Sequence, residues 1–226
     1  MKYLCSTILI FSFIFTGPAF AAKKKLHIDS FTDGNNVSEQ GGWWYVFNDA
    51  RLGGNTEVTP LGELYPTKLK DAQGYAAHVE GTTGNKLGWD YFGFGVTLTK
   101  DSGCPKQKHV DISEYSTLEF KIKGDASGGR LTVALLYTGD SCDENYVPVT
   151  LTHWADYEAS VTSELTGEWR TVRLNLRNDF AQPKWAKPED IVPIESVLKS
   201  MSQIQWHYSS ADGDNLSVWV DDIYLY

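Results

Sequence analysis

Hydrophobic and polar residues alternate along most of this 226-residue chain with a period of two. In residues 118–123 (LEFKIK), three apolar side chains alternate with three charged ones. The same period recurs in residues 75–80, 88–98, 130–138, 169–176, 203–208 and 216–226. Such alternation predicts β-strands that bury one face, because successive side chains of a strand point to opposite sides of its sheet.

Turn residues separate these segments, and only residues 193–201 show a helical pattern, of about two turns. In the last segment the alternation slips at Asp221 and Asp222, which predicts a β-bulge. About eight to ten short strands with one short helix indicate an all-β fold. We therefore expect a single β-sandwich, with antiparallel strands in two packed sheets.

Residues 41–49 (GGWWYVFND) gather four aromatic residues in one predicted strand. Trp43, Tyr45 and Phe47 should share one face of this strand, and Trp44 and Val46 the other. One face belongs to the core, and the sequence leaves open which of the two neighbours Trp44 and Tyr45 it contains. The ring on the other face is available to a ligand.

Residues 89–95 (WDYFGFG) repeat this arrangement. Phe92 and Phe94 alternate in register with apolar residues 96 and 98, which places that side in the core. Trp89 and Tyr91 then point outward beside two glycines, residues 93 and 95. Glycines on an outward face predict a shallow slot in which a ligand approaches the backbone.

The N-terminus has the pattern of a secretory signal peptide. Lys2 is followed by an apolar run of about 12 residues, too short to span a bilayer, and then by Ala19-Phe20-Ala21. We expect residues 1–21 to be removed and residues 22–226 to form one domain. The predicted location is secreted or periplasmic, without insertion into a membrane.

Charge and cysteine content narrow the function further. The net charge of −9 argues against nucleic acid as a partner, because an acidic surface repels phosphates. One of the three cysteines lies inside the signal peptide. Cys104 and Cys142 remain, and in an exported protein such a pair predicts a disulfide. In the chain-entropy picture, closing that loop stabilises the fold by about 3–4 kcal/mol.

The order of several motifs resembles a known group of proteins. These motifs are IDSFTDGNN (28–36), GGWWYVFNDARLGGNTEVTP (41–60), GWDYFGFGVTL (88–98), DISEYSTLEFKIKGD (111–125), FAQPKWAKP (180–188) and VWVDDIYLY (218–226). Together they resemble family 11 carbohydrate-binding modules and the related complex I intermediate-associated protein 30 domains. The resemblance covers nearly all of residues 22–226. It implies a galactose-binding-like jelly roll whose concave sheet binds a β-glucan chain without catalysis.

Sugar recognition suggests which side chains carry such a function. An aromatic ring stacks on the apolar face of a pyranose, while carboxylates, amides and guanidinium groups bind its hydroxyls. Arg130 is one further group that could hold hydroxyls. The residues that we expect to bind carbohydrate are Trp44, Tyr45, Arg51, Trp89, Tyr91, Tyr137, Tyr157, Gln205 and His207. Trp185, which lies between prolines, is instead expected to cap the edge of the core.

The resemblance also implies a structural calcium ion, because jelly rolls of this kind often join their first and last strands through oxygen ligands. Asp33, Asp221 and Asp222 are the candidate ligands. Many relatives have a glutamate in the first motif where this chain has Thr32, so the match of the site is incomplete.

Two other functions stay open. A jelly-roll glycoside hydrolase or polysaccharide lyase needs converging carboxylates or a Tyr or His base, and no local motif groups such residues. A protein-assembly or adaptor domain would use the same outward rings to contact a protein. We expect a monomer whose partner is a polysaccharide or oligosaccharide.

Overall fold

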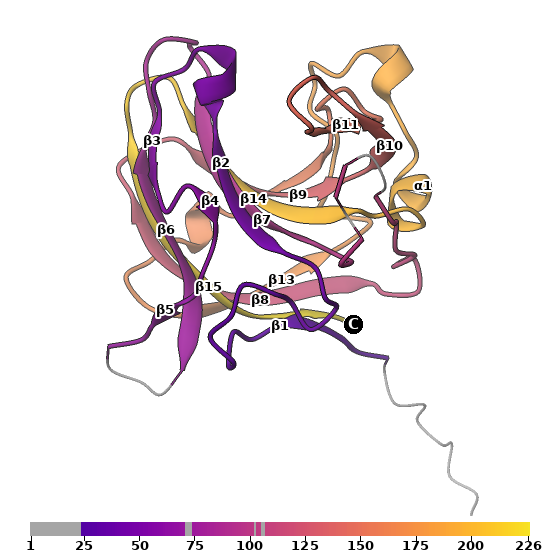
Figure 1. Ribbon diagram of the computed structural model, residues 1–226, viewed down its shortest axis with the longest axis horizontal. Helices are drawn as coiled ribbons and strands as arrows, with labels where there is room; N and C mark the ends of the chain where they lie inside the picture. The colour runs from indigo at the N-terminus through magenta and orange to yellow at the C-terminus, as the bar shows by residue number, and fades with distance from the viewer. Residues whose placement is uncertain (1–23, 71–73, 102, 105–106) are drawn as a thin grey trace, which may run out of the picture.

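Two antiparallel β-sheets pack face to face in the computed structural model, which describes residues 24–70, 74–101, 103–104 and 107–226 (Figure 1). The predicted signal peptide lies outside the described residues. The strands at residues 117–126, 203–210 and 215–225 alternate buried with less buried positions, as the sequence pattern requires. The all-β fold expected from that pattern is confirmed.

The first sheet has seven strands. Its main path is β13 (Arg170–Asn175), β8 (Thr117–Ala126), β15 (Asn215–Leu225), β6 (Tyr75–Thr82) and β3 (Glu57–Thr59). In addition, β1 (Leu26–Asp29) pairs with β15, and β5 (Thr67–Lys68) pairs with β6.

The second sheet has six strands, in the order β12 (Tyr157–Ser160), β9 (Arg130–Leu136), β14 (Gln203–Ser210), β7 (Asp90–Thr97), β2 (Trp44–Asn48) and β4 (Gly62–Glu63). A separate hairpin consists of β10 (Thr138–Cys142) and β11 (Pro148–Thr150). The helical segments are short: η1 (Asp49–Leu52), η2 (Thr162–Glu164), η3 (Pro188–Asp190) and α1 (Ile194–Leu198). The expected helix is therefore present, although shorter than residues 193–201.

The core between the sheets centres on Trp206 of β14, whose side chain is fully buried. Its ring stacks on Phe94 of β7 at a centroid distance of 5.4 Å and meets Phe120 of β8 edge-on at 5.4 Å. Burial of each such ring contributes about 1.5–3 kcal/mol to folding. Because these rings come from both sheets, they fix how one sheet sits on the other.

Trp44 belongs to this core, which corrects its assignment as a carbohydrate-binding residue. Only 1% of its surface is exposed, and its ring lies 6.0 Å from that of Trp206. The indole Nε1–H donates a hydrogen bond to buried Asp29 Oδ2 at 2.7 Å. The alternation of β2 therefore sends Trp44 and Val46 inward, and Tyr45 and Phe47 outward.

The bulge predicted at the end of the chain is present. The register of β15 against β8 shifts between Asp221 and Tyr224, and Asp222 has a φ of 50°. The structure contains more strands than the eight to ten that were expected. The additional ones, such as β4 and β5, have two or three residues, too few to show a period in the sequence.

The neighbouring residues Trp43 and Trp44 offer a test of this core. Trp44→Phe should lower the free energy of unfolding by about 1–3 kcal/mol, because the buried Asp29 carboxylate loses its donor. Trp43 is 48% exposed, so the matched control Trp43→Phe should change stability by less than about 0.5 kcal/mol. Urea denaturation measures both changes, and equal losses in the two variants would contradict the placement of Trp44.

Candidate functional site

The outer face of the six-stranded sheet, which faces away from the core, carries a row of rings from adjacent strands. Tyr45 and Phe47 come from β2, Tyr91 from β7 and His207 from β14, while Trp89 directly precedes β7. Each occupies the position that alternates with a buried core residue of the same strand. We call these five residues the ring row.

Two glycines of β7 make the ring row possible. A Cβ atom at Gly93 would lie 2.5 Å from Phe47 Cζ, and one at Gly95 would lie 3.1 Å from the Tyr45 hydroxyl. The Phe47 and Tyr45 side chains therefore lie across β7, above backbone that has no side chain. This corrects the expectation of a slot for ligand, because the protein's own rings fill that space.

Contacts between rings run continuously along the row. Phe47 lies 5.9 Å from His207 and 6.2 Å from Tyr91, measured between ring centroids. Tyr91 meets His207 edge-on at 4.9 Å and stacks on Trp89 at 6.0 Å, with an interplanar angle of 11°. Trp89 is 55% exposed, so the row ends in a ring that is open to solvent.

An amide and hydroxyl network borders the ring row on β14. The Tyr45 hydroxyl donates to Gln203 Oε1, and Gln205 Nε2 donates to the Tyr45 oxygen at 2.7 Å and to Gln203 Oε1 at 3.2 Å. Burial raises the pKa of Tyr45, so its hydroxyl keeps its proton. The network fixes the Tyr45 ring in place and presents neutral polar groups beside it.

His207 is a neutral imidazole in this setting. Burial, with a smaller contribution from nearby Arg130, lowers its pKa to about 4. Its buried Nε2 has no hydrogen-bond partner among the described residues. One ring nitrogen between Phe47 and Tyr91 is therefore left with unused hydrogen-bonding capacity.

Two carboxylates stand on the same face at β12. Glu158 pairs in register with Ala134, and two residues earlier is Asp156, which accepts a hydrogen bond from Thr152 Oγ1 at 2.7 Å. Burial raises the pKa of Asp156 to about 7. It also raises the pKa of Glu158, against the opposing effect of Arg130, whose Nη1 lies 3.3 Å away.

The turn η1 carries Arg51 to the other end of the ring row. Asn48 caps the turn, accepting from the Ala50 N–H at 3.2 Å. Buried Asp49 accepts from the Tyr91 N–H at 3.1 Å, which ties the turn to β7. Arg51 lies close enough to Tyr91 to oppose the rise in its hydroxyl pKa, which burial causes.

The structure places the other predicted site residues elsewhere. Tyr137 and Tyr157 pack, partly buried, against the core, and the Tyr157 hydroxyl donates to the Val192 carbonyl at 2.9 Å. Leu135 of β9 aligns with core residue Ile204 and with Tyr157, so Tyr157, and Tyr137 by the same alternation, are turned away from the ring row. Trp185, expected to cap the core, is instead 63% exposed.

Sequence reasoning missed several members of this face. Phe47 alternates with Trp44 and Val46 exactly as Tyr45 does, and Gln203 alternates with Ile204 as Gln205 does, so parity could have found both. Asp156 and Glu158 gave no such signal, because β12 has four residues and its pairing partner is distant in sequence.

Within the ring row, Trp89 is exposed to solvent, whereas Tyr45, Phe47, Tyr91 and His207 are partly buried. Two surface hollows lie away from the ring row, one at the ends of β3, β6, β8 and β15 and one beside β4 and β5.

The predicted calcium ligands do not form a complete metal site. Among the described residues, no three His, Cys, Asp or Glu side chains are grouped to hold a metal ion. Asp33 accepts from the Asn35 side chain, and Asp222 pairs with Lys121 at 2.6 Å. Asp221 is less well compensated: burial, then Asp222 and Asp29, raise its pKa to about 6.

With this geometry in place, comparison with known proteins identifies the family. A profile described as carbohydrate binding domain 30 matches residues 30–226. The chain belongs to the carbohydrate binding domain 30 family. The resemblance noted from the sequence is thereby confirmed, with family 30 as the matching profile and family 11 among the structural neighbours.

Individual relatives support the same fold. Endoglucanase 3 of Fibrobacter succinogenes is 25% identical over 206 residues, which cover 88% of this chain and 27% of that protein. A family 11 module from Clostridium thermocellum, solved with a β-1,3-1,4-mixed-linked tetrasaccharide, has a TM-score of 0.55 and 16% identity over 91% of this chain and 96% of that one. The family 30 module of a Clostridium thermocellum cellulosomal cellulase has a TM-score of 0.51 and 16% identity, covering 89% and 97%.

Membership of the domain 30 family supports carbohydrate binding as the general function. This chain spans about a quarter of the endoglucanase that it matches, so the activity of that whole enzyme does not transfer to it. Within the described residues, no helix is long and apolar enough to cross a membrane.

The raised pKa of Asp156 predicts how stability depends on pH. The folded state holds this proton more tightly than the unfolded state, so the contribution of Asp156 falls as pH rises from about 4 to about 7. Asp156→Asn should therefore raise the free energy of unfolding by roughly 2 kcal/mol at pH 8 and change it little at pH 4. Urea denaturation at both pH values tests this, with exposed Asp212→Asn as the control. An equal effect at both values would refute it.

Proposed function

We propose that this domain 30 chain is an exported, non-catalytic module that binds a β-glucan-type polysaccharide on the ring row. The observation that carries the proposal is the stacked pair Trp89 and Tyr91, which continues into Phe47 and lies on one rigid sheet. Two rings held parallel offer a surface that suits successive pyranose units, at a low cost in side-chain entropy.

The polar groups around the rings have the chemistry that sugar hydroxyls need. Gln205 supplies an amide, Glu158 and Asp156 supply carboxyl groups, and Arg130 supplies a guanidinium. Several of these groups are neutral or paired near pH 7, which favours a neutral glycan over a charged one.

Two relatives point to the class of glycan. One structural neighbour was solved with a mixed-linked tetrasaccharide, and the sequence relative is described as an endoglucanase. From these relatives we carry over to this chain only the class of ligand, a β-glucan. Family membership and the signal-peptide pattern favour a secreted or periplasmic location, and a monomer remains our expectation.

Affinity electrophoresis on mixed-linkage β-glucan tests the ring row. Trp89→Ala should weaken retardation by about ten-fold or more, because loss of a stacking ring removes roughly 1–3 kcal/mol of binding. The matched control is Trp185→Ala, which removes an equally exposed tryptophan outside the ring row. Retardation that is equal for wild type, variant and control would contradict the assignment of the site.

The same protein samples separate the alternative functions. A reducing-sugar assay and the absorbance of unsaturated ends should show no turnover of the bound glucan. If the wild type degrades the glucan and Asp156→Asn or Glu158→Gln abolishes that turnover, the protein is a hydrolase or lyase and the non-catalytic proposal is wrong. Absence of binding to a wide glycan panel, together with a protein partner lost in Trp89→Ala, would favour an adaptor.

A structural calcium ion near the β1–β15 junction is a second part of the proposal. Burial raises the pKa of both Asp221 and Asp29, and the charge of Asp29 adds to the rise at Asp221, so a cation there would stabilise the ionised carboxylates. Because the described residues contain no group of three such side chains, backbone or water oxygens would have to complete the shell.

Calcium should then raise the melting temperature. At a hundred-fold excess over its Kd, calcium should stabilise the fold by about 2.7 kcal/mol, which is several degrees. Asp221→Asn should abolish that response, whereas Asp212→Asn should preserve it. A melting temperature that is the same in calcium and in EDTA would remove calcium from the proposal.

A further inference from the structure

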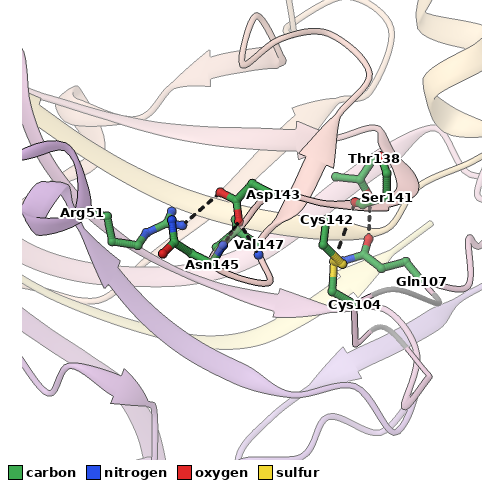
Figure 2. The surroundings of a disulfide bond; sticks show 9 residues. All are labelled: Arg51, Cys104, Gln107, Thr138, Ser141, Cys142, Asp143, Asn145 and Val147. Atoms are coloured by element: carbon green, nitrogen blue, oxygen red, sulfur yellow. Dashed lines mark hydrogen bonds and ion pairs between the residues drawn. A yellow bond between two sulfur atoms is a disulfide. The ribbon is translucent and has the colours of Figure 1, made fainter.

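An ion pair joins two segments that leave the six-stranded sheet at opposite ends. Arg51 Nη1 on η1 lies 3.5 Å from Asp143 Oδ2, at the tip of the β10–β11 hairpin (Figure 2). We call this pair the clasp. Its side chains are 43% and 38% exposed, so the contact lies at the surface.

The position of the clasp follows from the strand register. Turn η1 follows Asn48, which aligns with Phe92 and through it with Tyr208. The hairpin follows Leu136, which aligns with Gln203. These exits are about 16 Å apart along the strands and about 14 Å apart across β14 and β7. To meet Arg51, the hairpin must therefore extend diagonally over this sheet.

The clasp lies on the side of the sheet that bears the ring row. Arg51 acts on the hydroxyl of Tyr91, which is an outward residue of β7. In Figure 1 the β10–β11 hairpin and the turn after β2 rise on either side of β7 and β14. The clasp thus joins two projections across the end of the ring row at which Trp89 and Tyr91 stand.

The Asp143 half of the clasp is held in position. Asp143 Oδ1 accepts from the N–H groups of Asn145 and Val147, each at 2.9 Å, which leaves Oδ2 for Arg51. Next to it, Cys142 forms the predicted disulfide with Cys104, with a Cα–Cα distance of 5.8 Å (Figure 2). The disulfide ties the hairpin to the loop that follows β7. The hairpin therefore cannot swing away freely when the ion pair breaks.

We propose that the clasp determines which part of a glycan reaches the ring row, selecting free chain ends and short oligosaccharides over the interior of a long chain. This inference rests on the proposed function. A closed clasp bridges the approach to Trp89 and Tyr91, so a chain end can slide beneath it, whereas an internal segment requires it to open. The disulfide limits how far the hairpin moves when the clasp opens.

The strength of the clasp limits the size of the effect. A surface ion pair of this exposure changes an equilibrium by about two- to five-fold, and salt weakens it. The apparent affinity for internal chain segments equals their intrinsic affinity multiplied by the fraction of molecules in which the clasp is open. The clasp should therefore discriminate moderately rather than exclude long chains.

The experiment compares one oligosaccharide with one polymer of the same linkage. Calorimetry with a mixed-linkage tetrasaccharide and with mixed-linkage glucan gives the ratio of the two affinities. Asp143→Asn keeps the acceptor for Asn145 and Val147 but removes the charge, and should raise polymer affinity by about two- to five-fold while oligosaccharide affinity stays constant. Arg51→Met should shift the ratio in the same direction. Arg173→Met, which breaks an ion pair with Glu119 on the other sheet, is the control.

The outcomes are separable. A raised polymer-to-oligosaccharide ratio in Asp143→Asn but not in Arg173→Met, reproduced in wild type by high salt, supports the clasp. Glycan binding with an unchanged ratio in both clasp variants overturns the clasp and leaves the proposed function intact. Absence of binding by wild type to either ligand overturns both. A drop in oligosaccharide affinity in Arg51→Met alone would make Arg51 a direct ligand group and overturn the selecting role.

Discussion

The absence of side chains at two positions of β7 is the constraint on which the outer face depends. Gly93 and Gly95 lie in the middle of the six-stranded sheet, and no Cβ atom could be added there without meeting Phe47 or Tyr45. Because these rings lie across β7, side chains of β2 reach β14 and join two strands that are not neighbours. A rigid aromatic surface results, without any long loop to support it.

Strand periodicity made much of this arrangement predictable. The alternation in residues 89–98 correctly placed Phe92 and Phe94 inside and Trp89 and Tyr91 outside, because a long central strand shows its period clearly. The same rule left Trp44 and Tyr45 undecided. A strand with aromatic residues on both faces gives no hydrophobic contrast from which to choose the core side.

Long-range pairing explains what the sequence could not provide. The partners of Tyr45, residues 203 and 205, are about 160 positions away along the chain, so their network depends on the order of strands in the sheet. Likewise, the sequence around Asp143 does not indicate that its ion-pair partner is Arg51. The disulfide was predictable because two cysteines, which leave one pairing, remain outside the predicted signal peptide, whereas its role beside the outer face required the path of the hairpin.

Electrostatics links the fold to the kind of ligand that the outer face suits. The chain is strongly acidic overall, yet burial shifts the titrating groups of this face toward their neutral forms, with the pKa of His207 near 4 and that of Asp156 near 7. Burial of these groups costs stability that a purely structural surface would have no reason to give up. Neutral donors and acceptors beside aromatic rings match a neutral, hydroxyl-rich polymer, because such a ligand compensates polar groups without bringing a charge of its own. This electrostatic character therefore supports the proposed binding of a neutral glycan.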